Sequence, residues 1–191
     1  MPSYSDREIV EKANGGDIRA FRILVERHQA FVYSLSYRFV GTAGDAEDIS
    51  QESFIRLWKN LSLYRPEIKL TTWLYKIVTN LCLDFLKSRY NKNRKRMVDL
   101  EDHTGMISEW NTDQPILNEE LFVAVERITE DLSPKQKAVF VLRDMEDLPM
   151  QEIAKILSMS PGKVKSNLYY ARKKVGEKIT VYYETKKPAK Q

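Results

Sequence analysis

The chain has 191 residues, 42% of them hydrophobic, which is enough for one domain or two small ones with true cores. No apolar run approaches the roughly 18 residues of a membrane span, and the charged start MPSYSDREIV lacks the apolar stretch of a signal peptide, so we expect no membrane insertion and a cytoplasmic location. The formal net charge is +4, yet residues 86–96 hold six Lys or Arg and no acid, whereas residues 97–120 hold seven acids and no Lys or Arg. This segregation predicts an anionic partner for part of the chain.

Four helices are predicted in the first 96 residues. Ser5 is suited to cap a short helix that ends at the NGG of residues 14–16, and Asp17 is suited to cap the next one. A third helix is expected to begin at Asp45, with that side chain as its cap. The fourth follows the turn LYRPEIK (63–69). Apolar residues recur near every 3.6 positions in these segments, so we expect a single helical domain.

The rest of the chain is also predicted to be helical after an interruption. The interruption contains Gly and Pro and has no sustained period, as is typical of a linker. The helices predicted beyond it are 118–132, 133–145, about 149–158 and 161–179. Ser133 and Pro134 have the residue types that cap and start the second of these. The predicted fold class is all-α, with two small helical domains joined by a linker: residues 1–96, the linker 97–117, residues 118–183 and a basic tail at 184–191.

The stretch LPMQEIAKILSMSPGKVKSNLYYARKKV (148–175) has the spacing of a helix-turn-helix. The inner faces of its two helices are predicted to be Met150, Ile153, Ala154 and Leu157, then Val164, Leu168, Ala171 and Val175. Ser160 and Pro161 can cap and start the second helix. An arc of that helix well away from its inner face carries Lys165, Ser166, Tyr169, Arg172 and Lys173. Cations, hydroxyls and a ring on one arc suit a helix that reads the DNA major groove; a hairpin with a solvated basic face is the alternative.

The stretch DAEDISQESFIRLW (45–58) gathers carboxylates on one helix face. A metal site is disfavoured, because helical carboxylate sites use Glu-x-x-His motifs and neither His28 nor His103 follows a Glu by three residues. Acid–base catalysis needs a pocket that shifts pKa values, and this face is predicted to be solvated. Helix capping explains the first acids but not the apolar Ile55 among them. A protein-binding face therefore fits better.

A second mixed stretch, LYRPEIKLTTWLYKIVTN (63–80), surrounds the turn into the fourth helix. Its cations, hydrogen-bonding side chains and ring are the mixture that holds single-stranded or flipped bases: Tyr64, Lys69, Thr71, Thr72, Lys76 and Asn80. Ordinary packing is the alternative interpretation, above all for Trp73 and Tyr75. Cys82 is the only cysteine, which excludes an intramolecular disulfide, and we interpret it as a packing residue.

Three blocks of the chain resemble the extracytoplasmic-function (ECF) sigma factors, the small two-domain initiation subunits of bacterial RNA polymerase. The blocks are GDIRAFRILVERHQAFVYSLSYRFVGTAGDAEDISQESFIRLWKNL, TTWLYKIVTNLCLDFLKSR and LSPKQKAVFVLRDMEDLPMQEIAKILSMSPGKVKSNLYYARKKV, in the order and spacing of the family. The resemblance implies a protein that is not an enzyme and that starts transcription by recognising minus-35 and minus-10 elements. It implies no cofactor and no metal. The implied partners are the polymerase core, through its β′ clamp helices and β subunit, promoter DNA and an anti-sigma factor.

The resemblance also implies roles for individual residues. Those implied to bind the β′ clamp helices are Asp48, Gln51 and Glu52, with Ile55 as an apolar neighbour. Those implied to read the minus-10 element as a separated strand are Tyr64, Lys69, Thr71, Thr72, Trp73, Lys76 and Asn80. Those implied to contact the minus-35 element or its phosphates are Lys163, Lys165, Ser166, Tyr169, Tyr170, Arg172 and Lys173. Two positions depart from the family pattern, since Ser158 stands where many members have Gly and Tyr170 where a basic side chain is common.

Two other functional classes remain open at this point. A stand-alone helix-turn-helix regulator with a dimerisation or sensor domain explains residues 120–179, but it leaves the acidic face around Asp48 and Ile55 without a role. A helical metalloenzyme is the third class, and the shortage of ligands weighs against it. Binding of core polymerase and metal analysis of the purified protein separate the three.

Overall fold

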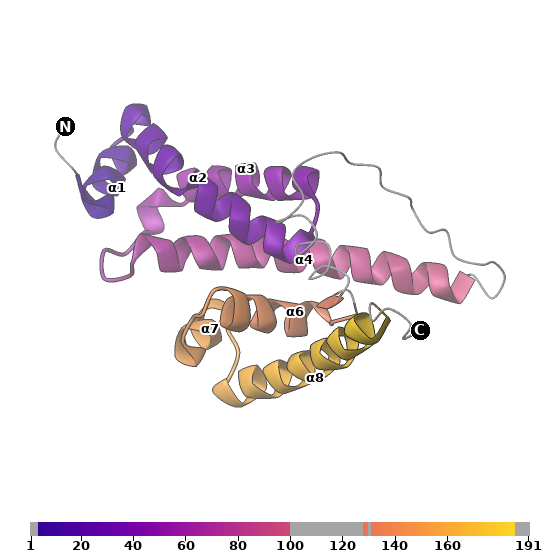
Figure 1. The fold of residues 1–191 in the computed structure, drawn as a ribbon. Coiled ribbons are helices and arrows are strands. Elements are labelled where there is room, and N and C mark those ends of the chain that lie inside the picture. Colours follow the sequence, from indigo (N-terminus) through magenta and orange to yellow (C-terminus); the bar gives the residue numbers. More distant parts are fainter. Residues whose placement is uncertain (1–3, 100–127, 130, 186–191) are drawn as a thin grey trace.

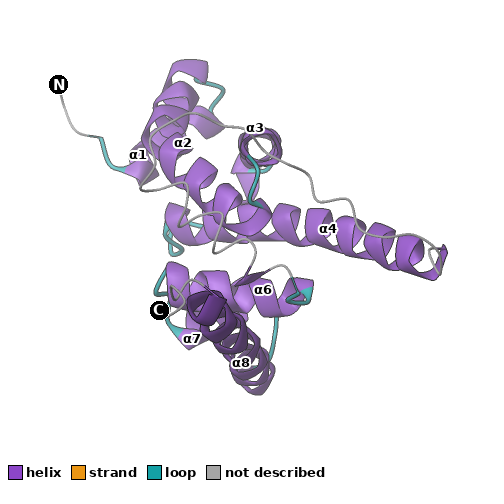
Figure 2. Ribbon diagram, turned by 45° about the vertical axis from the view of Figure 1, so that its right-hand side comes forward, coloured by secondary structure: helices purple, strands orange, loops and turns teal. Residues whose placement is uncertain are grey.

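The computed structural model describes residues 4–99, 128–129 and 131–185, and the regular structure within these ranges is helical, which confirms the all-α fold class (Figures 1 and 2). The elements are α1 (Asp6–Asn14), α2 (Ile18–Val40), α3 (Ala43–Lys59), the 3-10 turn η1 (Leu61–Leu63), α4 (Leu70–Asp99), α6 (Pro134–Phe140), the π-helical turn η2 (Val141–Met145), α7 (Met150–Ile156) and α8 (Pro161–Thr185). The expected linker from residue 100 onward, most of the helix expected at 118–132 and the last six residues of the expected tail lie outside the described residues.

Local sequence signals account for how the first two helices begin. The Ser5 hydroxyl accepts a hydrogen bond from the Glu8 N–H, and the Glu8 carboxylate accepts one from the Ser5 N–H at 2.7 Å, which lowers the pKa of Glu8. Asp17 accepts hydrogen bonds from the N–H groups of Arg19 and Ala20 at 2.9 and 3.2 Å. Both predicted caps are therefore confirmed.

The predicted cap of the third helix is wrong. Helix α3 begins at Ala43, with Thr42 in extended backbone geometry before it. Asp45 lies in the first turn, where its carboxylate accepts a hydrogen bond from the Thr42 hydroxyl at 2.5 Å. Asp45 still places negative charge near the positive end of the helix dipole, which is the stabilising feature that made it resemble a cap.

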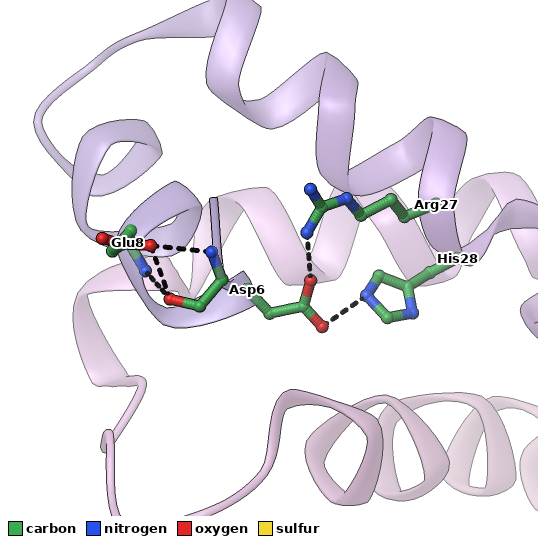
Figure 3. A network of polar contacts seen from close by, with 5 residues as sticks. Asp6, Glu8, Arg27 and His28 are labelled. Atoms are coloured by element: carbon green, nitrogen blue, oxygen red, sulfur yellow. Dashed lines mark hydrogen bonds and ion pairs between the residues drawn. The ribbon is translucent and has the colours of Figure 1, made fainter. Parts of the chain in front are cut away.

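A polar contact joins α1 to α2 (Figure 3). Asp6 receives Arg27 at 3.0 Å on one carboxylate oxygen and the His28 ring nitrogen Nε2 at 2.9 Å on the other. Both partners come from consecutive positions of α2. The short first helix is thereby oriented on the long second helix, while Ile9, Val10 and Ala13 pack into the core beneath it.

Helix α4 lies in the middle of the molecule (Figures 1 and 2). Helices α2 and α3 pack on one side of it, and α6 and α7 pack on the other. One continuous set of buried apolar side chains spans both sides, including Leu57, Leu74, Val78, Leu142 and Ile153. The last part of α4 extends past α2 and α3, and the helix ends at Asp99, so the expected domain boundary at residue 96 falls within it.

The second domain contains the predicted helix-turn-helix, formed by α7 and α8. Val164, Leu168, Ala171 and Val175 are buried, as the inner face of α8 was predicted to be. Ser133 and Ser160 are the caps expected from the sequence, and α8 extends to Thr185, past the expected end at residue 179. The set predicted for α7 missed Ile156, which is 2% exposed.

Candidate protein and nucleic-acid interfaces

The acidic stretch forms an exposed face of α3. Asp48 and Gln51 are exposed, and the Glu52 carboxylate accepts a hydrogen bond from Arg56 Nε at 2.9 Å. Ile55 is 46% exposed beside them, although an apolar side chain gains nothing from contact with water. The face is thus charged, open and partly apolar, which suits contact with another protein.

Trp58, one turn beyond Ile55, extends this face and was not among the predicted site residues. Its side chain is 38% exposed, and its ring meets the Phe21 ring edge-on at 4.7 Å. The contact holds the indole in place while part of it stays open to solvent. The spacing of three residues from Ile55 was the signal in the sequence that indicated a shared helix face.

The surface of α3 offers little support for the catalytic and metal alternatives. Within the described ranges, no group of three or more His, Cys, Asp or Glu side chains is close enough to share a metal ion. Glu47 and Asp48 of α3 are exposed and Asp45 and Glu52 are half-exposed, whereas a general acid or base usually lies in a sheltered pocket. Likewise, among the residues described, no helix is long and apolar enough to cross a membrane.

The minus-10 candidates surround the start of α4. The Tyr64 and Trp73 rings lie 5.5 Å apart with a tilt of 33°, and the Tyr64 hydroxyl donates to the Ile68 carbonyl at 2.9 Å. Partial burial raises the pKa of Tyr64. Lys69, Lys76 and Asn80 are exposed nearby. Rings and cations therefore occur together here, as a surface for single-stranded bases requires.

The two threonines of this set are less open. Thr71 and Thr72 are half-buried, and the Thr72 hydroxyl donates to Glu152 Oε1 of α7 at 2.7 Å. The structure thus places Thr72 at a contact with the second domain. This partner is 80 residues away in the sequence, and no local pattern indicates it.

The minus-35 candidates share the outer surface of α8. All seven are exposed, Tyr169 by 65% and Tyr170 by 52%, and the two rings meet edge-on at 5.4 Å. Several of them line a groove between α7 and α8, whose lining residues are Met150, Lys165, Leu168, Tyr169, Arg172 and Lys173. The DNA major groove is wide enough to admit an α-helix such as α8, whose exposed cations and rings would then face the bases and phosphates.

Arg172, one of the minus-35 candidates, already has a side-chain partner in the second domain. Its Nε and Nη2 donate to the two carboxylate oxygens of Asp144 at 2.9 and 2.5 Å. This hydrogen bonding raises the pKa of Arg172, and the bidentate geometry ties α8 to the turn η2. Asp144 was not predicted, and the separation of 28 residues leaves no sequence signal for the pair.

Known proteins resemble this chain in both halves. Residues 24–92 match the Sigma-70 region 2 family, and residues 122–175 match the Sigma-70 region 4 family. The ECF RNA polymerase sigma-E factor of Escherichia coli (strain K12) is 32% identical over 181 residues, which cover 92% of this chain and 94% of that protein. The RNA polymerase sigma-H factor of Pseudomonas aeruginosa is 28% identical over 185 residues, which cover 94% of this chain and 96% of that protein.

The solved structure of CnrH in complex with the cytosolic domain of CnrY has a TM-score of 0.65 to this chain at 22% identity, and the match covers 92% of this chain and 97% of that one. This likeness concerns the fold. The α3 and α4 candidates lie within the region 2 match, and the α8 candidates lie within the region 4 match.

Proposed function

Because this chain belongs to the ECF family of RNA polymerase sigma factors, and so directs RNA polymerase to promoters rather than catalysing a reaction, we propose that three of its surfaces divide this work. The α3 face of Asp48, Gln51, Glu52 and Ile55 binds the β′ clamp helices. The start of α4 reads the minus-10 element, and the outer surface of α8 reads the minus-35 element. The main support for this assignment is that one chain contains all three surfaces. Each surface is at least partly exposed, and each carries the residue types that its proposed partner requires.

The docking role of α3 is supported by its combination of acids and an exposed isoleucine. Acids that faced only water would help solubility and helix stability, but they would not require Ile55. Charged residues around an apolar contact steer association and set the register of a protein interface. Trp58 extends the apolar part, and we include it in the docking surface.

The DNA roles of α4 and α8 are supported by different chemistry at each surface. The partly exposed rings of Tyr64 and Trp73, tilted by 33° to each other, lie in the same stretch as the exposed Lys69 and Lys76, which suits unpaired bases and their phosphates. On α8, Lys165 and Ser166 carry donors near the start of the helix, where base edges are reached, while Lys173 lies two turns later. We assign Arg172 chiefly to holding α8 in place, since Asp144 already occupies its guanidinium group.

We further propose that the protein acts in the cytoplasm and is regulated by an anti-sigma factor. The structure with a TM-score of 0.65 is a complex of CnrH with CnrY, and another, with a TM-score of 0.61 at 17% identity, is the sigma factor RpoE of Bartonella quintana in complex with the anti-sigma factor NepR. Co-purification with a tagged copy of this chain from its native host is the direct test of such a partner.

Run-off transcription tests the main proposal. Purified core polymerase is combined with the full chain and a library of promoter fragments, and the transcripts are sequenced. We expect initiation that depends on the chain and on paired minus-35 and minus-10 sequences. A matched variant with Lys165→Ala and Tyr169→Ala should bind core polymerase as before and lose minus-35 preference. Transcription that ignores promoter sequence, or a variant that keeps the wild-type minus-35 preference, would contradict the proposal.

A further inference from the structure

Two acids of the second domain are held by side chains of the first. Glu146, at the end of η2, forms an ion pair with Arg38 of α2 and accepts a hydrogen bond from the Tyr75 hydroxyl of α4 at 2.8 Å. Glu152, in the first turn of α7, accepts a hydrogen bond from the Thr72 hydroxyl at 2.7 Å. The carboxylates therefore bind to a surface made by two helices of the other domain.

The contact at Glu146 is largely shielded from solvent. The Glu146 side chain is only 7% exposed and that of Arg38 is 29% exposed, so the carboxylate depends on its partners in place of water. The Phe31 ring meets the Tyr75 ring edge-on at 4.8 Å, which fixes the hydroxyl toward Glu146. Burial and the bond to Glu146 together raise the pKa of Tyr75.

The surroundings show that these bonds lie at the edge of a close-packed contact. Helix α4 contacts both α6 and α7, and buried apolar residues continue across that contact. Cys82 of α4 is buried there, near enough for Lys137 of α6 to act on it electrostatically. The acids thus fix the orientation of a packed surface and do not bridge a solvent gap.

We propose that Arg38, Tyr75 and Thr72 form a carboxylate-binding site, which we call the carboxylate clasp, and that its occupants are Glu146 and Glu152 of the same chain. The clasp holds the free chain closed. It also occupies Thr72, so a promoter strand reaches the start of α4 only after the second domain has moved away. This second consequence rests on the proposed minus-10 role of Thr72.

Competition between the acids and the strand should weaken the measured affinity for the strand. A DNA phosphate is an anion that the same donors would attract, so the strand and the acids exclude each other at this surface. When only a fraction of the chains is open, the apparent dissociation constant for the strand rises by the inverse of that fraction. Substitution of Glu146 and Glu152 in the second domain should therefore tighten binding of the strand to the first domain, whose own residues are unchanged.

The first experiment tests closure itself. The full-length Glu146→Gln/Glu152→Gln variant is compared with a control, Asp147→Asn/Glu177→Gln, in which two exposed acids of the second domain outside the clasp lose their charge. Asp147 pairs with Arg143 of its own domain, so the control matches the charge change without touching the clasp. Small-angle scattering should give a larger radius of gyration for the clasp variant only. An unchanged radius, with helicity retained by circular dichroism, would overturn the proposal.

The second experiment tests occlusion. A labelled single-stranded oligonucleotide carries the minus-10 sequence of a promoter that the polymerase complex is shown to use. We expect the clasp variant to bind this strand about tenfold more tightly than wild type, and the control variant to stay within about twofold. Equal affinities of the clasp and control variants would overturn occlusion. Failure of the proposed function is seen separately, as loss of promoter-dependent initiation by wild-type chain with core polymerase.

Discussion

Two lysines of α8 should separate base recognition from phosphate attraction. Lys165 and Lys173 are both exposed, but Lys165 lies near the start of the helix beside Ser166, and Lys173 lies two turns later. Lys165→Ala should cost about 1–3 kcal/mol and relax the preference at one or two minus-35 positions. Lys173→Ala should weaken all sequences about equally and lower the salt dependence by about one ion.

Initiation by the polymerase complex on a set of minus-35 variants at two salt concentrations measures this difference. Two lysines with the same charge and similar exposure serve as controls for each other. If both substitutions change every promoter alike, the surface of α8 attracts DNA only by charge, and Lys165 reads no base.

Ser158 occupies strained backbone in the turn of the helix-turn-helix. Its φ is +51°, in the left-handed region that Gly adopts without a steric cost. Ser158→Gly should therefore raise the free energy of unfolding by about 0.5–1 kcal/mol. Ser166→Gly, the same replacement inside α8, should instead lower it by about 0.5 kcal/mol. Urea denaturation measures both, and equal signs would refute the role of backbone strain.

At the scale of elements, the docking face of α3 can be tested without disturbing the core. Asp48→Ala with Glu52→Ala should weaken binding of core polymerase while leaving helicity unchanged, because the core side of α3 consists of other residues such as Phe54 and Leu57. The matched control is Glu11→Ala with Glu26→Ala, which removes two exposed acids that each pair with an arginine one turn away, as Glu52 does. Equal core affinity of the two double variants in a pull-down would rule out the docking assignment.

Helix starts were predictable where the signal was local. The cap roles of Ser5, Asp17 and Ser133 depend on residues within one turn, so short sequence patterns contain them. The start of α3 was missed because Thr42 and Asp45, three positions apart, are both residue types that cap helices. The end of α8 was missed because residues 180–185 contain no Gly or Pro to stop the helix.

At the scale of the whole molecule, the free chain should bind duplex promoter DNA weakly. The surfaces proposed for the two promoter elements lie on two domains that are packed together, and both elements are engaged only when the domains stand at the right separation. We expect core polymerase to supply that separation. Fluorescence anisotropy with duplex promoter, with and without core enzyme, measures the effect, and tight sequence-specific binding by the isolated chain would contradict it.

The contact between the domains could not be read from the sequence. Arg38 and Glu146 are 108 residues apart, and each looks like an ordinary charged residue in its own segment. The exposed sets on α3 and α8 were predictable because helical periodicity separates buried from open positions. Pairing across domains depends instead on tertiary packing, which has no period.

The central place of α4 has a consequence for how the chain melts. Thermal separation of the second domain from α4 would expose apolar side chains that the first domain does not cover. The helices of the two domains should therefore unfold as one cooperative unit. We expect calorimetry to show a single transition for wild type and two for the Glu146→Gln/Glu152→Gln variant. Cys82 is the only thiol of the chain and is fully buried in α4, so it should react with a disulfide reagent only after the second domain has moved away. The rate of this reaction therefore reports how often the two domains separate.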